Sequence, residues 1–341
     1  MPETDELAAG VHRLRLPRGP RLAHCTCVRR FAGRGRSVGL IVSPGSDEDL
    51  RVLEPYLTSW LGGPDGLHYV VLFEADPEMA MGAATLQQAS SQPWIVCSRD
   101  TFRLARYHGL DVRRTIFMDD LPRGELTLPT GHRLQCLPVH HCPARGAAML
   151  LDPEARLLFT GSLFATAELH EPLLGLRAWH EATMPSTSWL REAVARVAAL
   201  RTSALTVVPT YGQTWAGDDL RDAFDLLSAL EVGALGGDPT EDPHVDAARE
   251  VLTELTALLG ESPSSDLIDD PSFPILRREA GVVTGFRISG ALGLDVLGRA
   301  ALSALPAASK GLMRRALLDI ERLRGVTIAP ARPTHRPVPL R

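Results

Sequence analysis

Hydrophobic and polar residues follow a short-period pattern over the first 45 residues, before the spacing changes to that of a helix. Segments 11–16, 22–31 and 37–43 are rich in β-branched and apolar residues and are separated by turn-forming residues, which predicts three paired strands. Segment 46–61 begins with the cap-like residue Ser46 and then repeats apolar residues at helical intervals. We therefore expect a sheet that is followed at once by a covering helix.

The same alternation of strands and helices continues to about residue 236. Further strands are predicted over 68–73, 94–98, 113–118, 124–139, 147–153, 156–164 and 204–212. Further helices are predicted over 77–90, 100–109, 186–203 and 217–233. This order favours an α/β (α+β) fold in which two sheets pack together and helices flank them, with a domain boundary after residue 236.

Residues 237–341 are expected to form a C-terminal extension of mixed helical character. The segment 233–244 is rich in Gly, Pro and acidic residues and resembles a linker. Helices are predicted over 245–260 and 309–325, and the Pro- and Arg-rich tail 329–341 is expected to be irregular. The apolar stripes of the two helices indicate either a packed core or a homodimer contact.

Composition narrows the classes of function. Hydrophobic residues make up 45% of the 341 residues and the net charge is −5, so a real core is expected and nucleic-acid binding is not. The N-terminal segment has no long apolar run, which predicts neither signal peptide nor membrane span and favours the cytoplasm. Of the five cysteines only Cys25 and Cys27 are close, and without a second pair we expect buried, idle thiols. The alternative is that these two thiols bind a metal or take part in redox chemistry.

Candidate chemistry follows the predicted strand 68–73. Glu74, Asp76 and Glu78 occupy alternate positions directly after this apolar strand, and Met79 comes next. Carboxylates grouped at the end of a buried strand are typical of a metal site. The histidines that commonly accompany them are missing from the segment.

Several segments together carry a family resemblance. "VVLFEADPE", "HCPARGAAMLLDPEARLLFTGSLFA" over 141–165 and "VVPTYG" occur in the order found in the metallo-β-lactamase fold. The chain is most similar to the branch of flavodiiron and oxygen-binding diiron proteins. The resemblance implies an αββα sandwich over about residues 11–236, with two metals held by His and carboxylate ligands at one edge.

The resemblance also assigns the ligand positions, and here the chain departs from the family. The seven positions carry Glu74, Asp76, Glu78, Met79, His141, Ser162 and Tyr211. Ser162 cannot bridge two cations as the family's aspartate does, and Met79 is a poor ligand for a hard ion. Carboxylates crowded together without a cation repel one another. We therefore expect a degenerate site with no metal cofactor and no catalytic residue. The alternative is one Fe, Mn or Zn held by Glu74, Asp76 and His141.

Other histidines and nucleophiles offer alternative chemistry. His140 should point away from His141 on an extended segment, whereas His170 and His180 follow the "GSLFA" turn and could reach the site. Ser162 or Cys142 could pair with a neighbouring histidine as a nucleophile, although neither lies in a recognisable nucleophile motif.

The predicted function is that of a non-catalytic protein derived from an enzyme fold. The edge that holds metals in the family would bind a peptide or protein partner, such as an enzyme of a biosynthetic pathway. The alternative is a mononuclear metal-dependent hydrolase, or an oxygen-binding or oxidoreductase protein, that uses Glu74, Asp76 and His141.

Overall fold

The computed structural model describes residues 2–200, 205–233, 243–260, 269–271, 273–279 and 281–329. The chain divides into two compact units. The first comprises Met1–Arg18 and Leu22–Ala234, and the second comprises Gly19–Arg21 and Leu235–Arg341. The predicted linker lies mostly outside the described residues, as do the end of the predicted helix 186–203 and nearly all of the tail 329–341.

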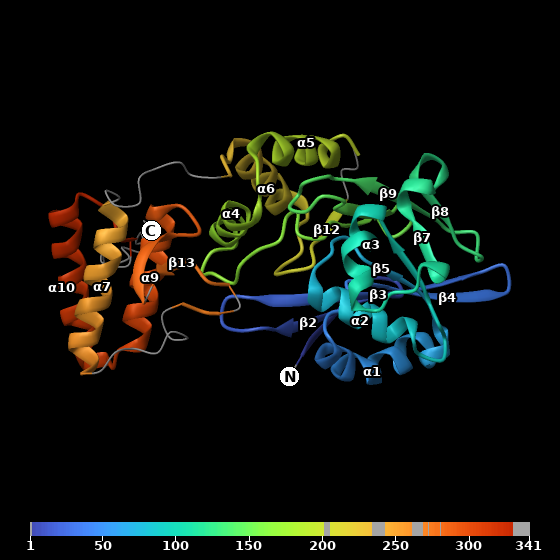
Figure 1. Cartoon of the computed structure of the whole chain (residues 1–341), viewed down its shortest axis with the longest axis horizontal. Helices are drawn as coiled ribbons and strands as arrows, with labels where there is room; N and C mark the ends of the chain where they lie inside the picture. Colours follow the sequence, from blue (N-terminus) through green and yellow to red (C-terminus); the bar gives the residue numbers. More distant parts are fainter. Residues whose placement is uncertain are drawn as a thin grey trace, which may run out of the picture. The chain divides into compact units, whose positions relative to one another are not determined.

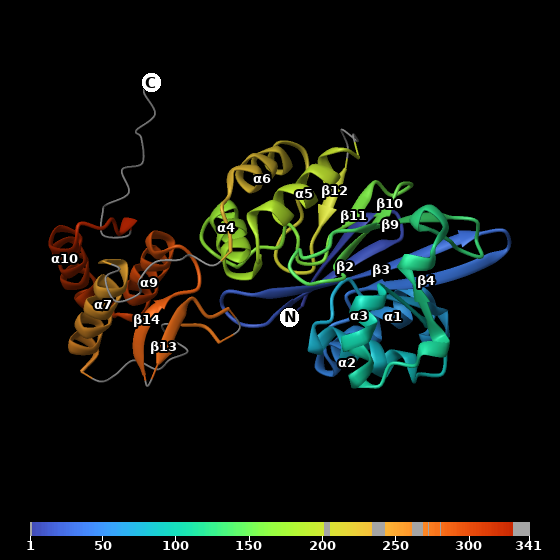
Figure 2. The same ribbon diagram turned by 45° about the horizontal axis from the view of Figure 1, so that its top comes forward.

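Two sheets form the centre of the first unit (Figures 1 and 2). The first sheet has seven strands in sequence order, antiparallel from β1 to β4 and parallel from β4 to β7. Its strands are β1 Glu3–Ala8, β2 Val11–Pro17, β3 Ala23–Gly33, β4 Arg36–Val42, β5 Leu67–Val71, β6 Trp94–Cys97 and β7 Thr115–Phe117.

The second sheet has five strands in the order β12-β11-β10-β9-β8. All of its pairs are antiparallel except β11 with β12. Its strands are β8 Glu125–Thr127, β9 Arg133–Pro138, β10 Ala148–Asp152, β11 Leu157–Phe159 and β12 Thr206–Val208.

Helices cover both outer faces, so that α1 and α2 lie on one side of the sheets and α5 and α6 on the other (Figure 1). The helices are α1 Asp47–Leu61, α2 Pro77–Gln87, α3 Arg99–Ala105, α4 Pro172–Thr183, α5 Thr187–Ala198 and α6 Gly217–Ala229. Short 3₁₀ turns are η1 Pro64–Gly66, η2 Arg106–His108, η3 Val112–Arg114, η4 Met118–Asp120 and η5 Pro122–Gly124. The predicted αββα sandwich is confirmed.

Burial explains why the parallel strands are apolar on both faces. In β5, Val71 belongs to the core between the sheets together with Leu134 and Leu150 of the second sheet. Its neighbour Val70 faces the other way and packs with Leu53 of α1. Strands covered on both faces are expected to be continuously hydrophobic, and β5 is of this type. The polar residues that follow β5 therefore lie where the strand leaves the core.

The helix that follows β4 begins where the sequence predicts. Ser46 caps α1, because its side chain accepts a hydrogen bond from the Asp49 amide while the Asp49 carboxylate accepts one from the Ser46 amide. The left-handed Gly62 ends the helix.

The second unit contains three helices and a hairpin among its described residues. The helices are α7 Pro243–Leu259, α9 Gly290–Ala304 and α10 Ala307–Arg324, and α7 packs against both others. Strands β13 Leu276–Glu279 and β14 Val282–Phe286 pair antiparallel. This hairpin was not among the predicted strands, and its turn includes Gly281 with a φ of 83°.

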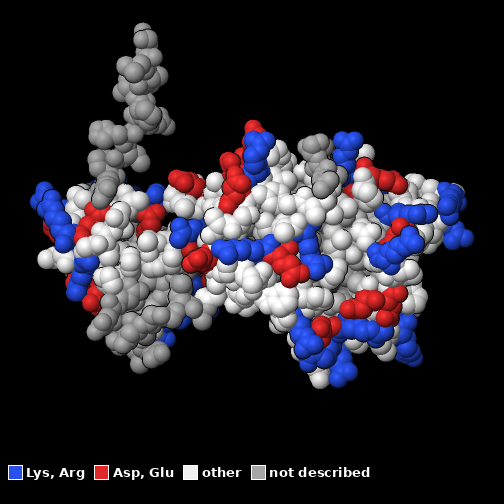
Figure 3. Space-filling view, turned by 90° about the horizontal axis from the view of Figure 1, so that it is seen from above, with Lys and Arg blue, Asp and Glu red and all other residues white. Residues whose placement is uncertain are grey.

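Charged residues of both signs are interspersed on the face shown in Figure 3. Among the described residues, every helix is too short or too polar to span a bilayer.

Candidate functional site

The segment after β5 turns sharply into helix α2, and Asp76 makes this turn. Asp76 is the N-cap of α2, and its Oδ1 accepts hydrogen bonds from the amides of Glu78 at 2.9 Å and Met79 at 3.3 Å. Pro77 occupies the first helical position, where its missing amide hydrogen costs nothing. Asp76 therefore starts a helix as well as facing the site.

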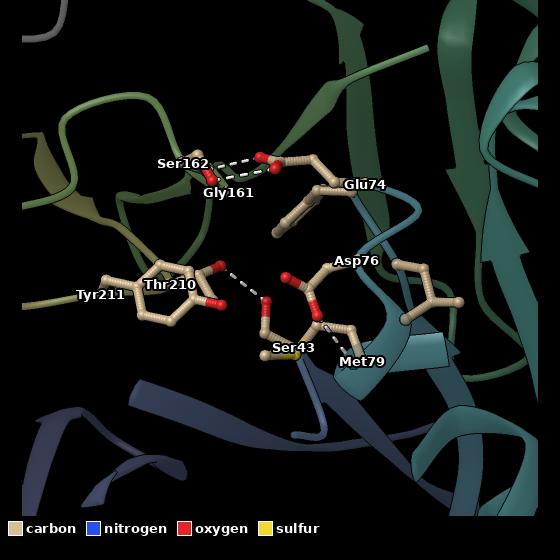
Figure 4. Close-up of a pocket in the computed structure, with 10 residues that line it drawn as sticks. Ser43, Glu74, Asp76, Met79, Gly161, Ser162, Thr210 and Tyr211 are labelled. Carbon is tan, nitrogen blue, oxygen red and sulfur yellow. Dashed lines mark hydrogen bonds between the residues drawn. The ribbon is translucent and has the colours of Figure 1, made fainter. Parts of the chain in front are cut away.

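A small cavity lies at this edge of the sandwich, between the end of β5 and the turns that follow β4, β11 and β12 (Figure 4). Its volume is about 20 Å³, which is room for about one water molecule. The residues that line it are Ser43, Leu72, Phe73, Glu74, Asp76, Met79, Gly161, Ser162, Thr210 and Tyr211. Five of the seven predicted site residues are among them.

Glu74 and Ser162 form the main polar contact of the cavity. The Ser162 amide donates to Oε1 of Glu74 at 2.7 Å, and the Ser162 hydroxyl donates to Oε2 at 2.8 Å (Figure 4). Burial raises the pKa of Glu74 to about 7, the two hydrogen bonds from Ser162 oppose this, and the charge of Asp76 adds to it. Glu74 thus changes charge near neutral pH.

Gly161 permits this close approach. Its φ is 62°, and a Cβ at this position would lie 2.9 Å from Oε1 of Glu74. Glycine adopts this conformation without strain and leaves the carboxylate room.

The opposite wall consists of residues from strands far apart in sequence. The Ser43 and Thr210 hydroxyls are 2.8 Å apart, and the Tyr211 hydroxyl points into the cavity (Figure 4). Nε2 of the buried His24 lies 3.1 Å from the Ser43 carbonyl oxygen, and burial lowers the pKa of His24 to about 4. The Tyr211 ring packs against the Trp179 ring at 4.8 Å. Burial, followed by the nearby carboxylates, raises the pKa of Tyr211 well above its usual value.

Sequence reasoning did not find His24, Ser43, Thr210 or Trp179. His24 immediately precedes Cys25, and its strand position places it beside Tyr211, with which it forms an isolated bridge. Its only sequence signal was a buried polar residue in an apolar strand. The thiols of Cys25 and Cys27 are buried and their pKa values are raised by burial.

Glu78 does not line the cavity, and Arg18 holds it outside. The Arg18 guanidinium lies 3.0 Å from the Glu78 carboxylate and also contacts Asp49. The Glu78 side chain is more than half exposed. Its charge is therefore balanced at the surface.

His141 also lies outside the residues that line the cavity. Its ring packs against the Trp189 ring with 4.8 Å between centroids, and its amide donates to the Ala144 carbonyl. His140 is exposed.

The other candidate groups have structural roles or lack a partner for catalysis. Nε2 of His180 accepts a hydrogen bond from the Phe164 amide, and burial lowers the pKa of His180 to about 4. His170 lies near Glu171. Burial raises the pKa of Cys142 to about 12, which disfavours a thiolate nucleophile. The Ser162 hydroxyl donates to a carboxylate and not to a histidine.

Two sheets between helical layers, with a carboxylate-bearing turn at one edge, are the architecture of the metallo-β-lactamase fold. Residues 31–212, more than half of the chain, match the family described as "ODP family beta lactamase". The chain therefore belongs to the ODP family.

Several solved structures with the same fold are described as diiron or flavodiiron proteins. The chemotaxis sensor ODP, described as a peroxy diiron species, is 20% identical, with 68% of this chain and 96% of that chain covered and a TM-score of 0.53. The Flv1 flavodiiron core of Synechocystis sp. PCC6803 is 15% identical, with 74% and 69% covered and a TM-score of 0.56. A flavo di-iron protein variant of Thermotoga maritima is 11% identical, with 77% and 71% covered and a TM-score of 0.57. No curated protein matches the sequence.

These comparisons contradict the expectation of no cofactor, because the similar structures are described as diiron and flavodiiron proteins. The chain itself keeps three carboxylates in segment 74–78, and carboxylates are possible ligands for iron.

The contacts of this chain differ from those expected of a two-iron ligand set. Both oxygens of Glu74 accept from Ser162, Oδ1 of Asp76 accepts from two amides, and Glu78 pairs with Arg18. In the part of the chain that the structure describes, no three His, Cys, Asp or Glu side chains are grouped to hold a metal ion. The donors present thus do not fit two irons in this arrangement.

Proposed function

We propose that this chain is a non-catalytic member of the ODP family that binds a peptide or protein partner through the surface around Trp189 and His141. One observation carries the proposal: Ser162 donates hydrogen bonds to both carboxylate oxygens of Glu74, inside a cavity of about 20 Å³. Such a cavity leaves no space for a substrate, since ligand pockets usually measure hundreds of Å³.

Partner binding is supported by the residues outside the cavity. Trp189 lies on α5 with 39% of its surface exposed, and it packs against the His141 ring. Tryptophan is enriched among the residues that dominate binding energy at protein interfaces. An exposed tryptophan that packs on a histidine ring is suited to binding a side chain of a partner at the surface.

Oxygen chemistry provides the first test. The purified chain is incubated with Fe(II) without oxygen and then freed of excess iron. Its iron content is measured, as is its O₂ uptake with a chemical reductant. A non-catalytic protein shows no uptake above an equal amount of iron in buffer. Uptake that the His141→Ala variant loses would overturn the proposal and establish the alternative, an oxygen-reactive protein that uses His141.

Partner capture provides the second test, and the chain offers a matched control. Trp189 and Trp94 are exposed to nearly the same extent, 39% and 37%. Tagged wild-type chain is used to retain a partner from cells of its source, and the partner is then titrated against both variants. Trp189→Ala should weaken binding about 30-fold, as expected for an aromatic hot spot, and Trp94→Ala should not. Equal effects of the two variants, or no specific partner, would exclude this surface.

A further inference from the structure

The second unit lies outside residues 31–212, which match the family, and it carries a groove of its own. Helices α7 and α10 pack side by side in this unit, and a groove of about 530 Å³ runs along their surface. Its apolar residues are Leu258 of α7 together with Leu312, Ala316, Ile320 and Leu323 of α10. We call this surface the α7–α10 groove.

Two of these leucines project from the groove into solvent. Leu312 is 56% exposed and Leu323 is 77% exposed. With Ala316 and Asp319 they follow spacings of 4, 3 and 4 residues, which places them on one stripe of α10. Apolar residues at such spacing form the contact stripe between paired helices, and three of these four residues are apolar. The same surface therefore presents both projecting leucines and the hollow that could receive them.

The charges of the two helices are opposite. Helix α10 carries Lys310, Arg314, Arg315, Arg322 and Arg324 against Asp319 and Glu321, which is five basic and two acidic residues, or +3. Helix α7 carries Asp246, Glu250 and Glu254 against Arg249, which is three acidic residues and one basic residue, or −2. Within the unit, Arg324 already pairs with Asp246 and Glu250. Four charged residues line the groove itself: Arg315 of α10 is basic, whereas Glu250 and Glu254 of α7 and Asp319 of α10 are acidic.

We propose that the α7–α10 groove binds the same groove of a second copy of this chain, in a two-fold arrangement that places α10 of each copy against α7 of the other. Leu312 and Leu323 of each copy then enter the groove of the other, and Arg315 of each copy lies near Glu254 of the other. Two-fold contacts use the same patch on both copies, so a surface with both parts of each pair is what they require. A second copy of this chain is favoured over an unrelated helix because the hollow, the projecting leucines, the acidic Glu254 and the basic Arg315 all lie on one surface.

The self-association of the full chain tests this directly. Sedimentation equilibrium or light scattering is measured from about 1 to 100 µM, a range that covers typical weak dimers. Leu312→Asp combined with Leu323→Asp should raise the dimer dissociation constant at least about 100-fold. Leu104→Asp, at a leucine of α3 that is 48% exposed, is the matched control and should leave it unchanged. Circular dichroism verifies that the variants fold.

A charge exchange tests the register of the two copies. Glu254→Arg and Arg315→Glu each place like charges in both contacts of a homodimer, so each variant alone should associate more weakly. Mixing the two variants restores opposite charges in both contacts, so the heterodimer should form at least about 10-fold more tightly than either homodimer. A wild-type chain that stays monomeric to about 100 µM, a dimer unaffected by the leucine variants, or mixing without preference would each overturn the proposal.

Discussion

Replacement of Glu74 by glutamine tests how much a buried carboxyl group costs this fold. Burial raises the pKa of Glu74 from 4.5 to about 7, which is about 2.5 units. Each unit corresponds to 1.36 kcal/mol, so the shift is equivalent to about 3 kcal/mol. A group whose pKa is raised in the folded state contributes its full stability below pH 4.5 and loses it as the pH rises through about 7. Above that, the ionised Glu74 destabilises the fold by this amount.

Glutamine keeps the shape of Glu74 and remains uncharged. Its oxygen can accept from the Ser162 amide, while its NH₂ group can donate to the Ser162 hydroxyl oxygen after that hydroxyl turns. The variant should come within about 1 kcal/mol of wild type near pH 5, where little of the wild-type stability has been lost. It should exceed wild type in free energy of unfolding by about 3 kcal/mol at pH 8.

Urea unfolding from pH 5 to pH 8, followed by tryptophan fluorescence, measures this difference. All five tryptophans precede residue 234, so the signal reports on the first unit. A chelator is present so that no bound cation offsets the charge of Glu74. Glu78→Gln is the control, because Glu78 is largely exposed and paired with Arg18, and it should give no gain at pH 8. Parallel pH profiles for Glu74→Gln and wild type would refute the reasoning.

Three further changes test the surroundings of the cavity. Gly161→Ala should lose about 1–3 kcal/mol in urea unfolding, because φ is 62° and the new Cβ lies 2.9 Å from Glu74; a loss below about 0.5 kcal/mol contradicts this. Ser162→Ala should lower the free energy of unfolding by about 1 kcal/mol, and it should raise the pKa of Glu74 further because the hydrogen bond from the Ser162 hydroxyl lowers that pKa. A ¹³C carboxyl titration by NMR in which the pKa of Glu74 falls would contradict this. Burial lowers the pKa of His180 from 6.5 to about 4, so between these pH values the unfolded state binds a proton that the folded state does not. The free energy of unfolding should therefore fall as the pH falls from 6.5 toward 4. A His180→Gln variant whose free energy of unfolding falls equally over this range would argue against this origin.

The sandwich could be predicted because its strands and helices have the hydrophobic periods that their burial requires. Strand β1 could not, since Glu3–Ala8 is acidic and largely exposed and has no apolar face to detect. It is held instead by pairing with β2 and by ion pairs such as Asp5 with Arg13 and Glu3 with Arg15. Cross-strand charges of this type become visible only when the register is known.

The residues of the site also divide into those that could be predicted from the sequence and those that could not. Glu74, Asp76, Met79, Ser162 and Tyr211 were predicted from matching segments, and they line one cavity. The side chains that complete the cavity meet through contacts between strands distant in sequence.

Helix α2 starts at a residue that also faces the cavity, and this limits what sequence variation at position 76 can reveal. Asp76 must present an oxygen to the amides of Glu78 and Met79 whatever else it does. Natural selection for a stable helix start alone would retain Asp, Asn, Ser or Thr there. An aspartate retained at position 76 in related proteins therefore does not by itself indicate that a metal site is retained. Glu74 does not cap a helix, so substitutions at position 74 are the ones that would indicate a change in the function of the site.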